Sequence, residues 1–489
     1  MALLRTSWIP LLASATLLAA CATNPVSGRS EVALMSRSDE VKIGQQMHTQ
    51  ILQQMGQYDD AALQDYVQYV GAKLAKQSHR PELDWHFTVV DTDDVNAFAL
   101  PGGYVYISRG ILPYLSSEAE LAAVLGHEIG HVTARHAVRQ QSKAAGVGIL
   151  STAAAIFTGQ GAVGDLTNVA GQAVLSGYGR EMELEADGLG AEYLARTEYD
   201  PDAIIRVVGA LKEQELFERE QARLENREPR IYHGVFASHP DNDKRLHEAI
   251  QAAAKVANGG TGRVENRDAY LRAIEGLAFG SSRRQGMLRE NRFYHADMQF
   301  TMAFPREWRV QNGATELLAY SPARNDVLLL TSEAPPQNVT SPREFINRAL
   351  GNLSLSGSEA LKINGFDAYT VVARNHPSPF GNRPVRYVVI YFSNAMWVFK
   401  GASRTGESVP AADRLFLSTA QTFRRLKDTE FALAEPYRLH IIKAGQDTRV
   451  EDLARNFPIK AYAAQQLRLI NDLYPDRQPK PGDALKIVR

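Results

Sequence analysis

Cysteine is almost absent from this chain of 489 residues, which has a single one, Cys21. One cysteine excludes a disulfide framework, even for an exported protein. An excess of charge of either sign is also missing, because 54 Lys and Arg residues nearly balance 55 Asp and Glu residues. A chain so close to neutral gives no reason to expect nucleic acid as a partner.

Long hydrophobic runs are scarce as well. Beyond the N-terminus no segment reaches about 18 uninterrupted apolar residues, so we expect the bulk of the chain to be soluble. At the N-terminus an apolar run from Trp8 to Leu18 follows Arg5. This run is too short to span a bilayer as a stable helix, and residues 1–20 are therefore predicted to be a secretory signal.

Cys21 ends the segment "LLAAC", which resembles the lipidation box of bacterial lipoproteins. The resemblance implies that Cys21 is lipidated and becomes the mature N-terminus. Ala22, in place of an aspartate, favours the outer membrane by the same resemblance. Residues 21–36 would then be a lipidated tether on the periplasmic face of that membrane. The alternative is a cleaved signal with an incidental cysteine.

The first half of the chain is predicted to form one mainly helical domain with a small sheet. Apolar positions at helical spacing predict two helices in 39–76 and further helices in 117–257. Alternating and β-branched residues in 84–107 predict strands around a Pro-Gly-Gly turn. The domain is expected to span residues 37–257.

The second half is predicted to hold two further domains, which makes the fold class α+β multidomain. A break at "NGGTG" opens residues 258–285, which we interpret as a linker. Residues 286–427 show strand and helix patterns of an α+β domain without a titratable cluster, so no chemistry beyond substrate recruitment or packing is assigned to them. Residues 435–489 have a strand, helix, helix, strand pattern of their own.

The segment "AAVLGHEIGHVTARH", residues 122–136, has the spacing of a metal centre. His127 and His131 are four apart and lie on one face of a helix, so both rings can point at one ion. Zinc in catalytic sites takes three protein ligands and keeps a fourth position for water. Glu128 is rotated away from the histidine pair and is placed to take a proton from metal-activated water. The alternative is a helix with polar side chains on its wet face.

The sequence also predicts where the helix around this motif begins and which of its faces is buried. Ser117 followed by Glu120 has the spacing of a capping box. Apolar residues then recur at helical spacing, namely Leu121, Val124, Leu125, Ile129 and Val132. The motif is therefore predicted to lie in a core-packed helix, as a metal site requires.

A third ligand is expected from another helix, in "YGREMELEADGLGAEYLAR", residues 178–196. The candidates are Glu181, Glu183, Glu185 and Asp187. Glu183 and Asp187 are four apart and share a face, so one can bind the metal while the other orients a histidine. Small residues, Ala186, Gly188 and Gly190, would permit close approach of this helix to its neighbour. The alternative is a solvated acidic face.

Three separated segments, "GHEIGH", "GREMELEAD" and "ASHPDNDKR", occur in the order found in a known family. Over roughly residues 30–255 the chain resembles the zinc metallopeptidase family of the CAAX prenyl endopeptidases, HtpX and BepA. The resemblance implies a gluzincin-like fold, with His127, His131 and Glu183 as ligands of one zinc ion. It further implies that Glu128 is the catalytic base and that Asp187 supports the ligands from outside.

His239 and Arg245 fall on the third of these segments and are predicted to be catalytic. Two roles are open for His239, namely stabilisation of the tetrahedral oxyanion and a fourth bond to zinc that keeps the enzyme latent. A turn histidine without a function is the alternative. No role is assigned to His136, which lies five residues past His131 and is expected to be turned off the ligand face.

Residues 435–489 resemble a LysM module in "HIIKAGQDTRVEDLA", "LRLINDL" and "PGDALKIV". That resemblance implies binding to a glycan that contains N-acetylglucosamine, such as peptidoglycan. A purely structural cap is the alternative.

Together these features predict a lipid-anchored, exported zinc endopeptidase for misfolded or unassembled envelope proteins, where the quality-control role is implied by the family resemblance. One rival is a non-catalytic chaperone or wall-binding scaffold, although such a protein has no physical need for Glu128. The other rival is a peptidoglycan hydrolase, which differs in its substrate.

Overall fold

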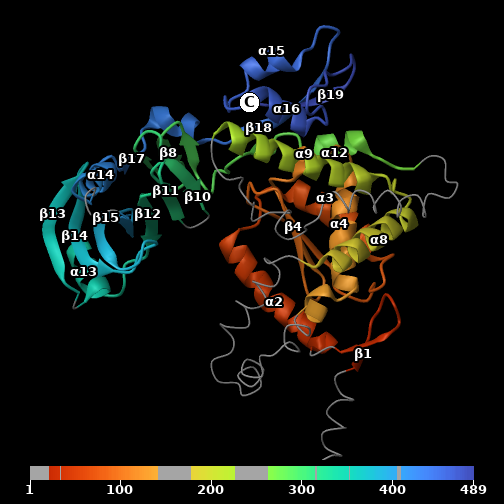
Figure 1. Ribbon diagram of the computed structural model, residues 1–489, viewed down its shortest axis with the longest axis horizontal. Coiled ribbons are helices and arrows are strands. Elements are labelled where there is room, and N and C mark those ends of the chain that lie inside the picture. The colour runs from red at the N-terminus through yellow and green to blue at the C-terminus, as the bar shows by residue number, and fades with distance from the viewer. Residues whose placement is uncertain are drawn as a thin grey trace, which may run out of the picture. The chain divides into compact units, whose positions relative to one another are not determined.

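The computed structural model describes residues 21–32, 35–140, 178–225, 263–313, 316–351, 353–404 and 409–489. It divides into two compact units. Unit 1 comprises residues 1–279 and 438–489, and unit 2 comprises residues 280–437 (Figure 1). Within the described residues, no helix combines the length and the apolar character needed to cross a membrane.

A three-stranded sheet in unit 1 runs beside two N-terminal helices. Its order is β3-β5-β4, in which β3 and β5 are parallel and β4 is antiparallel to β5. The elements of this region are the hairpin β1 (Cys21–Thr23) and β2 (Ser30–Val32), α2 (Arg37–Gln54), α3 (Ala61–Ala75), β3 (His86–Val90), β4 (Ala97–Leu100), β5 (Tyr104–Ser108) and the 3-10 helix η1 (Leu112–Tyr114). The predicted Pro-Gly-Gly turn joins β4 to β5. Gly102 and Gly103 have φ of 87° and 102° there, which glycine adopts readily.

The central helix of unit 1 is α4 (Glu118–Thr133), and all of its 16 residues are buried. The sequence predicted one apolar stripe, but α4 has no wet face because α3, α8 (Arg180–Arg196), α9 (Ala203–Leu224) and β4 all pack against it. The approach to α8 is close. A Cβ added to Gly130 would lie 3.0 Å from the carbonyl oxygen of Ala186, and one added to Gly190 would lie 3.1 Å from the amide nitrogen of His127. Gly188 makes no such contact.

The C-terminal elements belong to unit 1 and not to a separate body. Their sheet has the order β19-β18-β6, so a strand from before unit 2 pairs with strands from after it. The elements are α12 (Arg267–Ala273), β6 (Ala278–Phe279), β18 (Tyr437–Lys443), α15 (Val450–Arg455), α16 (Ala463–Ile470) and β19 (Ala484–Val488). The tail thus has the predicted strand, helix, helix, strand order. Residues 263–279, inside the predicted linker, instead form α12 and β6 of unit 1.

Unit 2 is built on an antiparallel sheet of seven strands, within the residues described, in the order β10-β11-β12-β16-β15-β14-β13. Side chains on β15 and β16 alternate between two apolar clusters. Val388 and Phe399 pack with Phe416 of α14 on one face, whereas Val389 and Val398 pack with Phe345 of α13 on the other. A smaller sheet has the order β17-β9-β8-β7.

The elements of unit 2 are β7 (Met287–Arg289), β8 (Arg292–His295), β9 (Phe300–Ala303), β10 (Arg309–Asn312), β11 (Glu316–Tyr320), β12 (Asp326–Glu333), α13 (Pro342–Leu350), β13 (Leu355–Ile363), β14 (Phe366–His376), β15 (Arg383–Phe392), β16 (Ala395–Ser403), α14 (Val409–Gln421), β17 (Arg424–Arg425) and η2 (Asp428–Ala434).

Candidate metal centre

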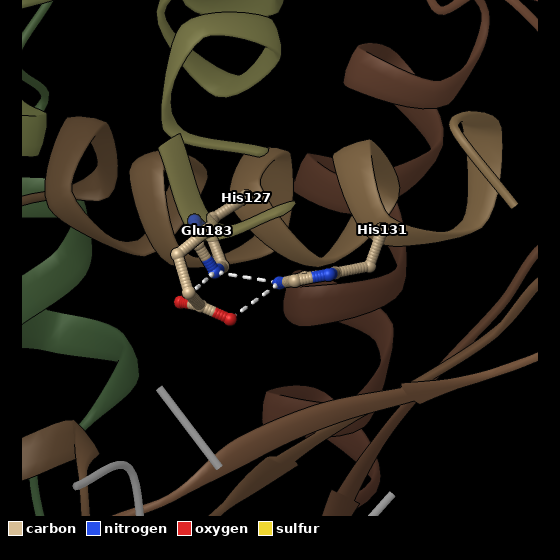
Figure 2. A group of neighbouring side chains, drawn as sticks. All are labelled: His127, His131 and Glu183. Atoms are coloured by element: carbon tan, nitrogen blue, oxygen red, sulfur yellow. Dashed lines mark hydrogen bonds and ion pairs between the residues drawn. The ribbon is translucent and has the colours of Figure 1, made fainter. Parts of the chain in front are cut away.

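Three side chains from two helices of unit 1 converge on one point. His127 and His131 come from α4, Glu183 comes from α8, and all three are buried (Figure 2). The two Nε2 atoms are 2.9 Å apart, and the Glu183 carboxylate oxygens lie 3.6 Å from Nε2 of His127 and 3.5 Å from Nε2 of His131. The structure therefore brings together the three residues that the sequence analysis named as ligands.

The outer nitrogen of each histidine is also engaged. Nδ1 of His127 lies 2.8 Å from Oδ1 of Asp187, which is 3% exposed. A buried carboxylate accepts hydrogen bonds, so this contact places the proton on Nδ1 and leaves the lone pair of Nε2 directed at His131 and Glu183. Nδ1 of His131 lies 2.8 Å from Nδ1 of His136.

The chemistry of this set of side chains fits a zinc ion. Two imidazole nitrogens and a carboxylate oxygen, all within 4.8 Å of one another, concentrate electron pairs in a buried place, and a cation offsets that arrangement. Imidazole and carboxylate are ligands that zinc accepts, and three protein ligands are the set found in catalytic zinc sites. His127, His131 and Glu183 would hold the ion.

Glu128 is 2% exposed and follows His127 on α4. It lines a pocket together with His127 and Asp187. The remaining lining of this pocket is mostly apolar and comes from α4, α9 and two preceding segments, namely Ala97, Ile111, Ala123, Val124, Ile204, Val207, Val208 and Leu211. A carboxylate thus lies beside a candidate ligand at the edge of an apolar pocket.

The residues match a known family. Residues 61–253 match the model described as peptidase family M48. This similarity covers the two helices that carry His127, His131 and Glu183. It is 28% identical over 250 residues to the beta-barrel assembly-enhancing protease of Escherichia coli (strain K12), with 48% of each chain covered. The corresponding protease of Yersinia pestis is 31% identical over 242 residues, with 47% of each covered. This chain spans about half the length of these curated relatives.

A relative of another kind is the mitochondrial metalloendopeptidase OMA1 of Arabidopsis thaliana. It is 38% identical over 128 residues, which cover 26% of this chain and 26% of the relative. A bacterial protease and a mitochondrial metalloendopeptidase are therefore both similar to parts of this chain.

Three residues named in the sequence analysis have side chains that lie outside what the structure describes. His239 and Arg245 lie outside the described residues. Cys21 is the first residue of β1, but its side chain is outside what the structure describes. Their roles stay predictions.

His136 is not among the three clustered residues, as expected, but its ring contacts one of them, because its Nδ1 lies 2.8 Å from Nδ1 of His131. The helical phase of α4 cannot be extended to it, since α4 ends at Thr133 and Arg135 adopts a left-handed conformation with φ of 57°. Residues 136–140 then start a new helical segment. The signal available in the sequence was a histidine directly after the expected end of the helix.

Glu185, which the sequence analysis named among the candidate ligands, lies instead behind His136. Its Oε2 is 3.2 Å from Nε2 of His136 and 2.7 Å from Nη1 of Arg139. The hydrogen bond from His136, followed by that from Arg139, lowers the pKa of Glu185 to about 2 against the opposing effect of burial. Glu185 is therefore a carboxylate that supports the centre from outside.

The predicted capping box at the start of α4 is present in a modified form. The Ser117 side chain accepts from the amide of Glu120 at 3.2 Å, as expected. The Glu120 carboxylate, however, accepts from the amide of Ser116 at 2.7 Å instead of from that of Ser117. Burial, and then the charge of Asp472, raises the pKa of Glu120.

Proposed function

We propose that this chain is a zinc-dependent endopeptidase that hydrolyses peptide bonds with Glu128 as the general base. The observation that carries the proposal is the convergence of His127, His131 and Glu183 within 4.8 Å, with Glu128 in the pocket beside them. The names of the relatives, a protease and a metalloendopeptidase, support the same activity.

Each residue of the centre has its own role in the proposed reaction. Zinc, when bound there, supplies a Lewis acid that lowers the pKa of water to about 7 and polarises a carbonyl oxygen. Glu128 takes one proton from the attacking water, whose oxygen bonds to the carbonyl carbon of the substrate. The same carboxyl then gives that proton to the peptide nitrogen as the carbon–nitrogen bond breaks. Asp187 keeps the ring of His127 in one orientation through the 2.8 Å hydrogen bond.

The pocket beside Glu128 supports a preference in the substrate. Val124, Val207 and Leu211 are among its apolar side chains. An apolar wall next to the base would accommodate an apolar side chain near the bond to be cleaved. We therefore infer a preference for unfolded polypeptides, which expose such side chains.

The natural substrates would be misfolded or unassembled envelope proteins. The names of the bacterial relatives, together with the predicted lipid anchor at Cys21, support a place on the periplasmic face of the outer membrane. His239 would either stabilise the oxyanion or bond to zinc and keep the enzyme latent, with Arg245 close to it in sequence. The tail, if it is a LysM module, would add contact with peptidoglycan.

One experiment separates this function from its rivals. The purified full chain is given unfolded casein or purified murein, each with and without a chelator, and its zinc content is measured. We expect cleavage of casein that is lost with chelator and restored by zinc, and no change in murein. Murein cleavage would favour a peptidoglycan hydrolase, and bound zinc without cleavage of either would favour the scaffold.

A further inference from the structure

The two histidines of the centre are supported in different ways by carboxylates of the same helix. Asp187 of α8 contacts His127 directly, at 2.8 Å. Glu185, also of α8, is separated from His131 by the ring of His136. His136 is fully buried, with 0% exposure. The second ligand is thus connected to its carboxylate through an intervening imidazole.

The direction of these hydrogen bonds follows from the carboxylate. Glu185 accepts, so Nε2 of His136 is the donor in the 3.2 Å contact. A neutral imidazole with its proton on Nε2 has an unprotonated Nδ1, which accepts. In the 2.8 Å contact between the two Nδ1 atoms, His131 is therefore the donor. This leaves the lone pair of Nε2 of His131 facing His127 and Glu183.

The surrounding structure holds His136 in this place. The backbone turns at Arg135, whose side chain donates to Oε1 of Glu40 at 2.6 Å and to the carbonyl of Met35 at 2.8 Å. The ring of Tyr178 stacks on that of His131, with 4.1 Å between centroids and 20° between planes. Arg139 fixes Glu185 from the far side at 2.7 Å. Each ring and carboxylate in the series has a partner that restricts its rotation.

We propose that His136 is a positioning residue for the metal centre. Its Nδ1 accepts a hydrogen bond from Nδ1–H of His131, and its Nε2–H is anchored by Glu185. In this way His136 sets His131 in the tautomer and orientation that zinc requires. The inference rests on the proposed function, since it concerns how the same centre binds its metal. Outer partners of this kind typically contribute about 10–100-fold to metal affinity.

The test measures the zinc dissociation constant of the full chain by competition with a chelator of known affinity. It compares His136→Leu, which removes the acceptor, with His136→Asn, whose carbonyl oxygen stands where Nδ1 accepts. We expect His136→Leu to bind zinc about 10–100-fold more weakly and His136→Asn to recover most of that loss. The visible spectrum of the cobalt-substituted chain should change in His136→Leu and resemble wild type in His136→Asn.

A buried histidine of unit 2 provides the matched control. His295 is 5% exposed, its Nδ1 accepts from the amide of Met298 at 3.3 Å, and its Nε2 donates to the carbonyl of Arg284 at 3.0 Å. His295→Leu should leave zinc affinity unchanged. Glu185→Ala, at a partly exposed position, tests the same series of contacts if His136→Leu does not fold, and should weaken zinc binding in the same direction.

Wild-type affinity and an unchanged cobalt spectrum in His136→Leu, or in Glu185→Ala where the former does not fold, would overturn the inference. Equal losses of zinc affinity in His136→Leu and His136→Asn, with an equal fall in the melting temperature of the zinc-free chains, would also overturn the inference. Such a result would mean that His136 has a packing role only. A wild-type chain that binds no zinc would instead contradict the proposed function.

Discussion

Both halves of α4 carry buried polar side chains, yet only one of them resembles a site of chemistry. At the start of the helix, Glu118 is 4% exposed and accepts hydrogen bonds from the hydroxyls of Tyr66 and Tyr199 at 2.8 and 2.6 Å and from the amide of Asn266 at 2.8 Å. Acceptors there are matched by donors. Further along, His127 and His131 direct acceptor atoms toward a third acceptor on Glu183.

The comparison teaches that burial of polar groups alone does not mark a catalytic centre. Carboxylates at the start of a helix are also favoured by its dipole, so Glu118 and Glu120 are explained as structural groups. What distinguishes the other half of α4 is the gathering of electron-pair donors at one point, which a cation can satisfy.

The largest effect is expected for the ligand on α8. Glu183→Ala should lower zinc affinity by more than the about 10–100-fold typical of outer partners, and proteolysis should be lost with the metal. Glu181, on the same helix and exposed, is the matched control, and Glu181→Ala should bind zinc normally. Chelator competition and casein cleavage measure both. Zinc binding by Glu183→Ala at wild-type strength would remove this residue from the centre.

At the other end of the helix, Glu118→Ala should affect stability and not metal binding. It leaves the buried hydroxyl of Tyr199 and the half-buried hydroxyl of Tyr66 without their acceptor, and the free energy of unfolding should fall by about 2 kcal/mol. Urea unfolding of the zinc-free chain gives this value, and chelator competition on the folded variant gives the affinity. A loss of zinc affinity as large as that of Glu183→Ala would break the distinction between the two ends.

How far the sequence could predict this arrangement depended on the distance between partners. The spacing of His127 and His131, and the shared face of Glu183 and Asp187, are properties of single helices, and the structure brings these residues together. His136 was missed because a turn at Arg135 ends the helical phase that the prediction extended. The roles of His239 and Arg245 stay predictions.

The C-terminal contacts could not be predicted, because they join residues far apart in sequence. Lys486 of β19 is fully buried and donates to the carbonyl of Leu115 at 2.7 Å and to Oγ of Ser116 at 3.2 Å, just before α4. Oγ of Ser116 in turn donates to Asp472. No periodicity or local motif encodes such a contact, and the pattern at 258–285 predicted a linker where α12 and β6 lie.

Lys486 should make the stability of unit 1 depend on pH. Burial lowers its pKa from 10.5 to about 8, opposed by Asp472 and Glu120 and assisted by Arg267. Between pH 8 and about 10 Lys486 binds its proton more strongly in the unfolded chain than in the folded chain. Its contribution to the free energy of unfolding therefore increases as pH rises.

The matched variant for that prediction is Lys486→Met, which retains the length of the side chain. The free energy of unfolding of wild type minus that of the variant should increase from pH 8 to about 10. Comparison of the two chains cancels the effect of the other titrating groups, which both chains share. A difference that does not change with pH would contradict a lowered pKa for the buried Lys486.

The smallest effect is expected for the cap of α4. Ser117→Ala removes the side-chain acceptor for the amide of Glu120 and should lower the free energy of unfolding by about 1 kcal/mol, without a change in zinc affinity. Thermal unfolding with and without zinc tests this. A stability equal to wild type would mean that the modified capping box does not contribute.

The central claim is that Glu128 acts on water beside a metal held by other residues. Its most direct test is one purified variant, Glu128→Gln, for which zinc content and casein cleavage are measured on the same sample. The prediction is about one zinc per chain, as in wild type, with cleavage reduced by at least about 100-fold. Cleavage at the wild-type rate with zinc in place would contradict it.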